Sequence, residues 1–424
     1  MDVRRFDPEA AAILEAEEAR QRDTLMMIPS ENYCSPVVTA AQATVFGNKY
    51  AEGMPGARYY NGCVNMDAIE RLAIARAKQL FGAEHANVQP LSGAQMNMAV
   101  YHALLEPGDT VMALDLNQGG HLTHGSPVNF SARWYRFVHY GVDRDTELLD
   151  LEAIAEQARQ VRPKLIVTGA TAYPRQWDFA RWRTIADEVG AYLLADVSHI
   201  AGLIVGGAHP DPVPHCHVVT TTTQKTLRGP RSGLILCRAE LAQKIDKAVF
   251  PGIQGGPHMH TIFAKAVAFK EAQTEGFRAV QQRTVDNARA LAAALADGGL
   301  RLVSGGTDNH LMLVDLRPLN LTGKVAANLL EEAGIIVNKN TIPYDPKPPF
   351  VCSGIRLGTP GLSTRGMGRA EMQQIAEWIN EVLRQPDDQP GRARIAGSVR
   401  ELCARFPLWA EQDLRDSSVT SEPT

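Results

Sequence analysis

One lysine stands where a buried β-strand is expected to end. The stretch HVVTTTTQKT, residues 217–226, contains a run of β-branched residues that favour strands, and Lys225 follows this run after a single glutamine. A long cation is costly to bury there unless it is paired or consumed in a reaction. Desolvation also lowers the pKa of a lysine amine and frees it to attack carbonyl carbon. Lys225 is therefore a candidate nucleophile.

Three further groups fall at the ends of expected strands. Asp196 ends the apolar run AYLLAD, and His199 follows shortly after it. Ser92 and Gly93 begin a helix after ANVQP, and His121 lies in GGHLTHG after DTVMAL. Taken singly, these groups fit a structural Asp–His pair, a plain helix cap and a satisfied loop histidine equally well. Their shared position is informative, because open α/β sheets bind ligands outside the carboxyl ends of strands.

Together these groups match the needs of one cofactor, pyridoxal phosphate. Lys225 can form a Schiff base with the aldehyde, and Asp196 can keep the pyridine nitrogen protonated so that the ring accepts electrons. Free amides at the helix start can bind the phosphate, since Gly93 allows close approach to the backbone. The sequence therefore predicts a pyridoxal phosphate site centred on Lys225.

The elements that must position these residues alternate along the chain. We predict strands at 86–90, 109–114, 163–169, 191–196, 217–223 and 233–237, with helices at 94–105, 151–161 and 179–190 between them. Strand–helix alternation of this kind favours an α/β fold with a mostly parallel central sheet covered on both faces.

The remaining chain divides the protein into further units. The pattern of residues 1–25 predicts an amphipathic helix within an N-terminal arm. The pattern of residues 261–299 predicts one long helix that leads into a smaller α+β unit. The predicted domains are an arm at 1–35, a large cofactor-binding domain at 36–284, a small C-terminal domain at 285–412 and a disordered tail at 413–424.

Composition limits the partners. The 424 residues are 45% apolar and carry a formal net charge of −4, which is typical of a soluble globular protein without general affinity for nucleic acid or anionic lipid. No apolar run is long enough to cross a membrane, and the first residues do not resemble a targeting peptide. We therefore expect a cytoplasmic protein that binds neither nucleic acid nor membrane.

The cysteines and the HCH cluster carry no predicted chemistry. Six cysteines are scattered without paired spacing, so we expect reduced, structural thiols. In HCH, residues 215–217, alternate side chains of a strand point in opposite directions, and only the two histidines could share a ligand sphere. We predict no metal site.

Several longer motifs carry a family likeness. PSENY, NKYAEGMPGARYYNGC, FGAEHANVQP, GGHLTHGSPVNFS, VVTTTTQKTLRGPR, SGGTDNHLMLVDL, VNKN and SGIRLGTP occur in this order. From about Leu25 to Pro407 the chain resembles the serine hydroxymethyltransferase family. The resemblance implies a fold-type-I pyridoxal phosphate transferase, a homodimer or dimer of dimers with sites shared across the subunit interface, and tetrahydrofolate as co-substrate. It also implies that serine and glycine are interconverted and that the one-carbon unit leaves as 5,10-methylenetetrahydrofolate.

The resemblance also implies residue roles. Cofactor contacts would come from Ser92, Gly93, Ala94, His121, Thr171, Asp196, His199 and Lys225, with Gly255 and Gly256 reaching in from the neighbouring subunit. Ser30, Tyr60, His199 and Arg356 would bind the amino acid, and Glu52, Tyr59, Leu116, Gly120, Leu122 and Asn340 the folate. Lys225, Asp196, His121, Glu52 and Tyr50 would form the catalytic set, with Glu52 as the acid–base group.

Three positions depart from the usual family pattern. Gln224 stands where the family has histidine before the lysine, LSGAQ replaces HSGSQ at the phosphate turn, and Val197-Ser198 replaces a Met-Ala pair after Asp196. These changes cluster around the cofactor and leave the amino-acid substrate open. α-Methylserine, giving D-alanine, is an alternative to serine, because one methyl group is discriminated by only about 1–3 kcal/mol. A folate-independent aldolase or transaldolase is a further alternative.

Other classes fit less well. A non-catalytic binding protein on this fold would lack a catalytic group, whereas Lys225, Asp196, Arg356 and Glu52 are all present. An aminotransferase would need the same cofactor groups and remains a rival. A cysteine desulfurase needs a reactive cysteine on a mobile loop, and only Cys352 lies close to a motif expected to contact substrate.

Overall fold

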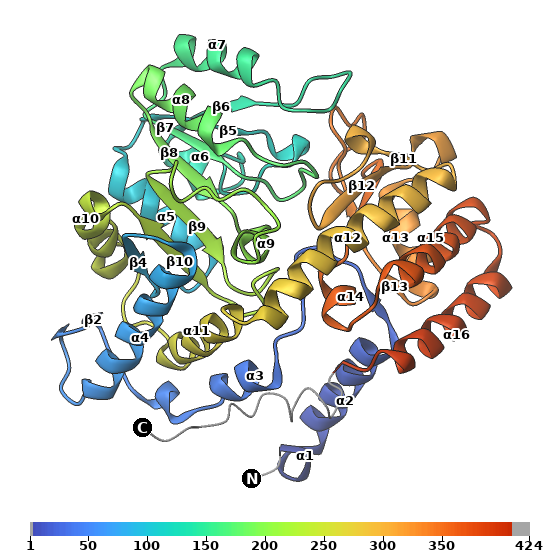
Figure 1. Cartoon of the computed structure of the whole chain (residues 1–424), viewed down its shortest axis with the longest axis horizontal. Coiled ribbons are helices and arrows are strands. Elements are labelled where there is room, and N and C mark those ends of the chain that lie inside the picture. The colour runs from blue at the N-terminus through green and yellow to red at the C-terminus, as the bar shows by residue number, and fades with distance from the viewer. Residues whose placement is uncertain (1–2, 409–424) are drawn as a thin grey trace.

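A seven-stranded sheet forms the centre of the larger part of the protein (Figure 1). The computed structural model describes residues 3–408, so the predicted tail at 413–424 lies outside the described residues. The strand order is β4 (His85–Asn87), β10 (Gly233–Cys237), β9 (Val218–Thr222), β8 (Tyr192–Asp196), β7 (Leu165–Thr168), β5 (Thr110–Leu114) and β6 (Arg136–Tyr140). Only β10 runs antiparallel to its neighbours. The predicted α/β class and mostly parallel sheet are confirmed, and β6 is a strand that the sequence analysis did not predict.

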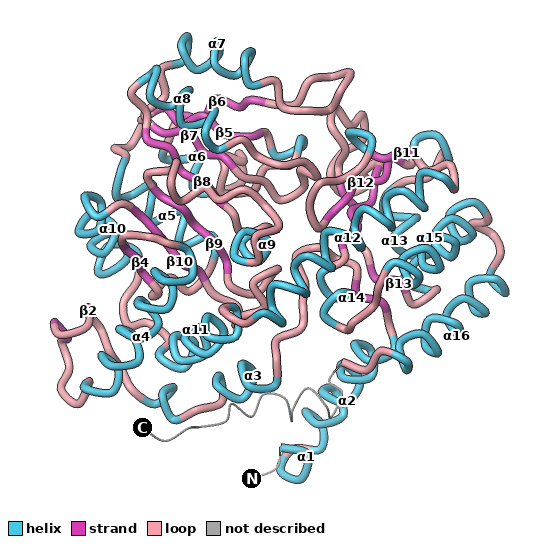
Figure 2. The backbone as a smooth tube through the Cα atoms, in the orientation of Figure 1, coloured by secondary structure: helices cyan, strands magenta, loops and turns pink. Residues whose placement is uncertain are grey.

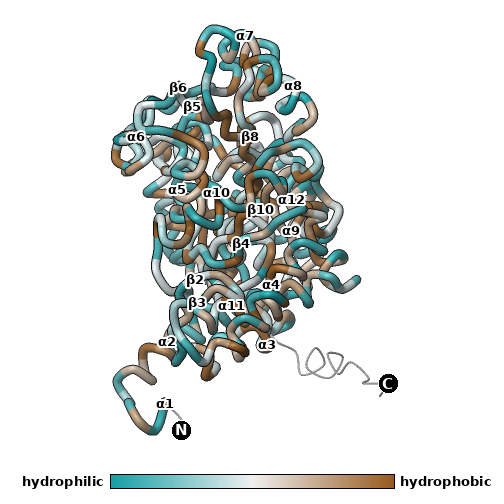
Figure 3. Tube along the Cα trace, turned by 90° about the vertical axis from the view of Figure 1, so that its left-hand side faces the viewer, coloured by the Kyte–Doolittle hydropathy of each residue, from teal (hydrophilic) through white to brown (hydrophobic). Residues whose placement is uncertain are grey.

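Helices cover both faces of this sheet, as Figure 2 shows. One face packs against α4 (Val64–Phe81), α7 (Leu151–Val161), α8 (Phe179–Val189), α9 (Ala201–Val205) and α11 (Met259–Ala272), and the other against α5 (Gly93–Leu104) and α10 (Ala242–Lys247). Successive residues of β5 alternate between the two cores: Met112 joins the first and Ala113 the second. Burial on both faces explains why β5, β7, β8 and β10 are mostly apolar along their whole length, and β8 runs brown through the interior in Figure 3.

A second, antiparallel sheet forms the smaller part. Its order is β11 (Arg301–Leu302), β12 (Leu311–Asp315), β15 (Gly354–Gly358) and β14 (Asn338–Asn340). Its core includes side chains of α12 (Glu275–Asp297), α13 (Gly323–Glu332), α14 (Pro360–Thr364), α15 (Arg369–Arg384) and α16 (Gln389–Arg405). Helix α12 belongs to both parts, because Val285 packs in the large core and Ala288 in the small one. The predicted boundary at 284/285 falls inside this helix and remains a prediction.

Two helix predictions are wrong in their extent. The N-terminal segment forms α1 (Val3–Phe6) and α2 (Pro8–Asp23), because Asp7 caps α2 through its side chain and Pro8 starts the helix. Only Ala11 of α2 is buried, and Ile13 is 72% exposed, so the described residues cover no amphipathic face of this helix. The long helix expected at 261–299 is two helices, because Thr274 caps α12 by accepting the Phe277 amide.

The N-terminal arm lies against the small sheet rather than the large one. Strand β1 (Leu25–Met26) pairs in parallel with β13 (Ile335–Ile336), and the Met27 carbonyl accepts from the Gly358 amide at the end of β15. The chain then crosses to α3 (Pro36–Gln42) on the large part, and the hairpin of β2 (Gly53–Met54) and β3 (Ala57–Arg58) follows. Short helix α6 (Phe130–Trp134) precedes β6. Among residues 3–408, no helix is long and apolar enough to cross a membrane.

Arg365 ties two helix ends together. Its guanidinium donates to the carbonyls of Gln21, Arg22 and Thr24 at the end of α2, and to Cys403 and Phe406 at the end of α16. Carbonyls in the last turn of a helix lack partners within that helix, so this buried cation satisfies both ends at once.

We predict that Arg365→Met lowers the free energy of local opening at these helix ends by about 2–4 kcal/mol, since hydrogen bonds to a charged group contribute about 1.5–3 kcal/mol each. Hydrogen–deuterium exchange of the last turns of α2 and α16 measures this change. Arg400→Met, an exposed position on α16, is the matched control and should leave exchange unchanged. Equal protection in both variants would contradict the assignment.

Candidate functional site

The strand-end residues predicted from the sequence meet in one cavity at the carboxyl edge of the large sheet. β8 ends at Asp196, β9 ends shortly before Lys225, and the loops after β5 and β7 bring in His121 and Thr171. The cavity is lined by Gly93, His121, His124, Ala170, Thr171, Asp196, Ser198, His199, Thr222 and Lys225. The structure thus brings together groups that lie far apart in the sequence.

Asp196 is buried and holds hydrogen bonds on both carboxylate oxygens. Asn97 Nδ2 donates to Oδ2 at 2.8 Å, and His124 Nε2 lies 3.4 Å from the same oxygen. The hydroxyl and the amide of Ser198 donate to Oδ1 at 2.6 and 3.1 Å. Burial alone would raise the Asp196 pKa, but His124, His121 and Ser198 outweigh it, and the pKa lies below the ordinary value. The carboxylate is therefore ionised.

His121 and His124 have fixed roles in their loop. His124 Nδ1 accepts from the His121 amide, which leaves Nε2–H to donate to Asp196. His121 Nδ1 accepts from the Thr123 amide at 3.3 Å and lies 2.8 Å from the Thr123 hydroxyl. Burial lowers the pKa of His121 to about 4, so its ring is neutral at physiological pH. His121 therefore presents an uncharged aromatic face to the cavity.

Lys225 is the reactive amine of the cavity. Burial lowers the pKa of Lys225 from 10.5 to about 8, and the charge of Arg356 acts in the same direction, while Asp196 opposes the shift. Its backbone carbonyl accepts from Asn32 Nδ2 at 3.1 Å, so the N-terminal arm holds the turn that carries the lysine. With this pKa, about one tenth of the amine is uncharged and nucleophilic at pH 7, far more than for an ordinary lysine.

His199 points to a second histidine, His310. His199 Nδ1 lies 3.2 Å from His310 Nε2, and both rings are buried. Burial lowers the pKa of His310 to about 3, and burial with the charge of Lys225 lowers that of His199 as well. Both rings are neutral, and His199 Nε2 is buried without a hydrogen-bond partner among the described residues.

Arg356 reaches toward the cavity from the small sheet. It lies on β15, and its guanidinium donates to Asn338 Oδ1 at 3.1 Å and to the Thr171 carbonyl at 2.7 Å. Burial lowers its pKa to about 10, which still leaves the group charged, and the opposing charge comes from Glu31. Ser30 is half-buried beside Glu31, in the segment that runs past the end of β15.

The predicted phosphate turn begins α5. Ser92 caps the helix by accepting the Gln95 amide, and Ala94 is exposed at its first turn. A Cβ placed on Gly93 would lie 2.8 Å from Thr222 Cγ2, so only glycine allows this approach to β9. Lys265, fully buried on α11, donates to the carbonyls of Val88, Pro90 and Gly233 and fixes the chain before the turn.

A second group of predicted residues lines a different hollow of about 490 Å³. Glu52, Tyr59 and Gly255 are among its lining residues. Gly256 and Tyr50 lie next to these residues, because a Cβ on Gly256 would lie 3.0 Å from the Tyr50 ring. Tyr60 packs edge-on against Tyr50, with 5.5 Å between the two ring centroids. Within one chain, the predicted catalytic residues therefore fall into two groups: the cavity of Lys225 and the hollow of Glu52.

The predicted folate residues are spread between these regions. Leu116, Gly120 and Leu122 lie on the loop that carries His121, with Gly120 buried and Leu122 46% exposed. Asn340 lies on β14, the strand that pairs with β15, and donates to its neighbour Thr341. Tyr59 lines the hollow of Glu52 instead and is 74% exposed.

Sequence reasoning missed several contributors. Asn97 lies on α5 and Lys265 on α11, and their signal is only a polar residue within an otherwise apolar helix. His310 lies just before β12, in the motif SGGTDNHLMLVDL, which did not show its contact with His199. Asn32 could have been found in PSENY. Gln224, the departure before Lys225, accepts from the Ser232 amide at 3.3 Å and so closes the turn around the lysine without a titratable ring.

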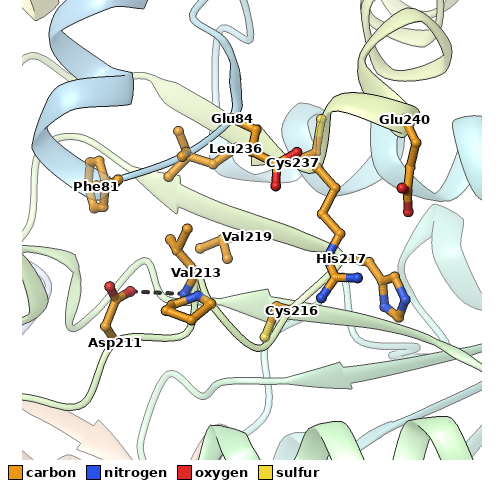
Figure 4. A pocket seen from close by; sticks show the side chains of 14 residues that line it. Phe81, Glu84, Asp211, Val213, Cys216, His217, Val219, Leu236, Cys237 and Glu240 are labelled. Carbon is orange, nitrogen blue, oxygen red and sulfur yellow. Dashed lines mark hydrogen bonds between the residues drawn. The ribbon is translucent and has the colours of Figure 1, made fainter.

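A further cavity of about 500 Å³ lies at the opposite edge of the large sheet, where β9 begins and β10 ends (Figure 4). It contains part of the HCH cluster. His217 Nδ1 accepts from the Leu193 amide at 2.9 Å, and burial lowers the His217 pKa to about 4 and raises that of the Cys216 thiol. In this arrangement the two side chains serve packing.

The groups in the Lys225 cavity fit pyridoxal phosphate. A nucleophilic amine suits the aldehyde, the ionised Asp196 suits a protonated pyridine nitrogen, and the start of α5 suits the phosphate. The unsatisfied His199 Nε2 also needs a polar partner, and a ring substituent or substrate oxygen supplies one.

This fold and this set of groups define a fold-type-I pyridoxal phosphate enzyme. A family profile described as serine hydroxymethyltransferase matches residues 3–379. A protein named serine hydroxymethyltransferase from Nostoc punctiforme is 58% identical over 409 residues, which cover 96% of each chain. The chain belongs to the serine hydroxymethyltransferase family.

Family membership confirms the resemblance described above. The protein is a pyridoxal-phosphate-dependent transferase of one-carbon metabolism that interconverts serine and glycine, with tetrahydrofolate as co-substrate. The comparisons favour this activity over the α-methylserine and folate-independent alternatives.

We predict that the Lys225 amine of the cofactor-free protein titrates near pH 8. Because burial favours the neutral amine, its reactivity toward an amine-specific acylating reagent should rise through this pH rather than near 10.5. Mass spectrometry of the Lys225 peptide across pH 6–11 measures the midpoint, with the exposed Lys324 peptide as the reference for reagent reactivity. A midpoint at the ordinary lysine value would refute the desolvation argument.

Proposed function

We propose that this chain transfers the hydroxymethyl carbon of serine to tetrahydrofolate with Lys225, Asp196 and Arg356 as its central residues. The observation that supports this most directly is the shared cavity of a lysine with a lowered pKa and an ionised aspartate. Bound pyridoxal phosphate supplies a carbonyl for the amino group and a ring that accepts the electrons released when a bond to the α-carbon breaks.

Lys225 would hold the cofactor through its side-chain amine. Its neutral form is the nucleophile, and its return to the cation is opposed by burial. Asp196 stays ionised and so favours a proton on the ring nitrogen. His121 would lie over the ring as a neutral aromatic group, and Ser92, Gly93 and Ala94 would face the phosphate at the start of α5.

Arg356 is suited to the substrate carboxylate. Only two of the five N–H donors of its guanidinium are used, by Asn338 and by the Thr171 carbonyl. The remaining donors can bind a carboxylate in the bidentate geometry that arginine favours. Because the guanidinium is held from two sides, it is oriented before the substrate arrives. Ser30 is placed to assist from the adjoining segment.

His199 would hold polar oxygen atoms next to the ring. Its Nε2 is unsatisfied and its ring is neutral, so it can donate one hydrogen bond to the ring oxygen or the substrate carboxylate. Thr171 lies on the same wall of the cavity. Together they would orient the cofactor and exclude one water molecule from its face.

We also propose that the working unit is a homodimer, or a dimer of dimers, in which the Glu52 hollow of one subunit completes the Lys225 cavity of the other. Tyr50, Tyr59 and Tyr60 are exposed in the single chain, at 60, 74 and 44%, which is unusual for three neighbouring aromatic residues. In the dimer Glu52 would move protons near the hydroxyl and the folate, Tyr60 would assist at the substrate carboxylate, and Gly255 and Gly256 would approach the phosphate.

The folate would enter along the loop that carries His121. Leu116 and Leu122 present apolar surface there, Gly120 is buried between them in the loop, and Asn340 lies at the small-sheet side. Flat pteridine and aminobenzoate rings suit such a surface, together with Tyr59. Cytoplasmic location and the absence of nucleic-acid binding remain predictions from composition.

The substrate assignment is tested by assay of the purified holoenzyme with tetrahydrofolate. We expect 5,10-methylenetetrahydrofolate from serine, with a kcat/KM at least about 10-fold above that for α-methylserine. Lys225→Ala should lose turnover and yield no cofactor-modified peptide after borohydride reduction. A preference for α-methylserine, with D-alanine as product, would overturn the serine assignment while leaving the cofactor site intact.

The shared site is tested by subunit complementation. Lys225→Ala and Glu52→Gln are each expected to be inactive. An equimolar mixture of the two should regain about one quarter of wild-type activity, because half of the dimers are mixed and one of the two sites in each mixed dimer is intact. Lys225→Ala mixed with Asp196→Asn is the matched control, since these defects lie in separate copies of the same cavity, and it should stay inactive. Failure of the first mixture, with mixed dimers demonstrated by differential tags, would refute a site built from two subunits.

A further inference from the structure

Ser198 connects the two strand ends that carry the cofactor groups. It lies in the cavity, two residues after Asp196, and is only 7% exposed. Its Oγ lies 2.6 Å from Asp196 Oδ1, and its own amide donates to the same oxygen at 3.1 Å. The Thr222 amide, at the end of β9, lies 3.2 Å from Ser198 Oγ.

The direction of these hydrogen bonds is fixed by their ends. A backbone amide can only donate, so Ser198 Oγ accepts from Thr222. An ionised carboxylate can only accept, so the hydroxyl proton of Ser198 is directed to Asp196. The chain of donors therefore runs from β9, just before Lys225, through Ser198 to the carboxylate at the end of β8.

As a result, both oxygens of the Asp196 carboxylate have hydrogen-bond donors. Oδ1 accepts two hydrogen bonds from Ser198, and Oδ2 has Asn97 and His124. Short hydrogen bonds to an ion are strong and withdraw negative charge from it. The usual family pattern has alanine at this position, which offers no donor to Asp196 and no acceptor to the Thr222 amide.

We propose that Ser198 is a positioning residue that fixes the Asp196 carboxylate and weakens the electrostatic stabilisation that this carboxylate gives to the protonated pyridine nitrogen. This inference rests on the proposed function, because it takes Asp196 as the partner of that nitrogen. Without the hydroxyl, more negative charge stays on the carboxylate, and the nitrogen holds its proton more firmly. Through its direct hydrogen bonds to Asp196, Ser198 thus adjusts how strongly the bound ring attracts electrons.

The test is ¹⁵N NMR of the full-length holoenzyme loaded with pyridoxal phosphate that is ¹⁵N-labelled in the ring. In Ser198→Ala the ring-nitrogen shift should move toward that of a fully protonated pyridinium. Ser198→Thr keeps the hydroxyl and should restore the wild-type shift, whereas Ser198→Cys, a weaker donor of similar size, should give an intermediate value. An unchanged shift in Ser198→Ala, or equal shifts in the Ala and Thr variants, would overturn the proposal.

Two controls separate the possible failures. Melting temperatures of the variants report packing, and a lower melting temperature without a change in ring-nitrogen shift would show a structural role and overturn the proposal. If Ser198→Ala does not fold, the Cys and Thr variants decide by the same shifts. Asp196→Asn should move the shift toward neutral pyridine. If it does not, the Asp196 assignment in the proposed function fails; if it does and Ser198→Ala is unchanged, only the role of Ser198 fails.

Discussion

A buried negative charge is the constraint on which this structure depends. Asp196 lies at the end of an apolar strand, where an isolated carboxylate would cost several kcal/mol, and four hydrogen bonds from Asn97, His124 and Ser198 keep it ionised. Each donor comes from a different place: α5, the loop after β5 and the end of β8 itself. Satisfying this one group therefore fixes the relative positions of the elements that surround the cofactor cavity.

The surroundings of Lys225 disfavour its charge, whereas those of Asp196 favour its charge. Lys225 has its charge disfavoured by burial and by Arg356, so it exists partly as a free amine, whereas Asp196 has its charge secured. The histidines between them are kept neutral by burial, and so they contribute shape and hydrogen bonds without adding charge. The cavity thereby has two chemically different sides. On one side Asp196 would favour an electron-accepting ring, and on the other Lys225 provides the nucleophilic amine.

Much of this arrangement could be predicted from the sequence, and the exceptions have physical causes. The strand before Asp196 is an apolar run and the strand before Lys225 is a run of valine and threonine, so their ends could be located closely, and parallel pairing then placed those ends together. Helix ends at Asp7 and Thr274 were missed because a single capping side chain outweighed a continuous helical pattern. The donors Asn97 and His310 were missed because contacts between distant segments leave no local signal. The two-group division of the site was implied only by resemblance, since exposure of Tyr50 and Tyr59 becomes visible only in three dimensions.

Helix α12 has a mechanical consequence for the region where substrate binds. It is one unbroken helix of 23 residues, about 35 Å long, embedded in both hydrophobic cores. Sliding of the two parts along each other would require this helix to bend. Arg356 lies on the small sheet, and Lys225 follows β9 of the large one. A small rotation would change the span between the group that grips the carboxylate and the group that holds the ring, and an amino acid of the right length would lock the angle.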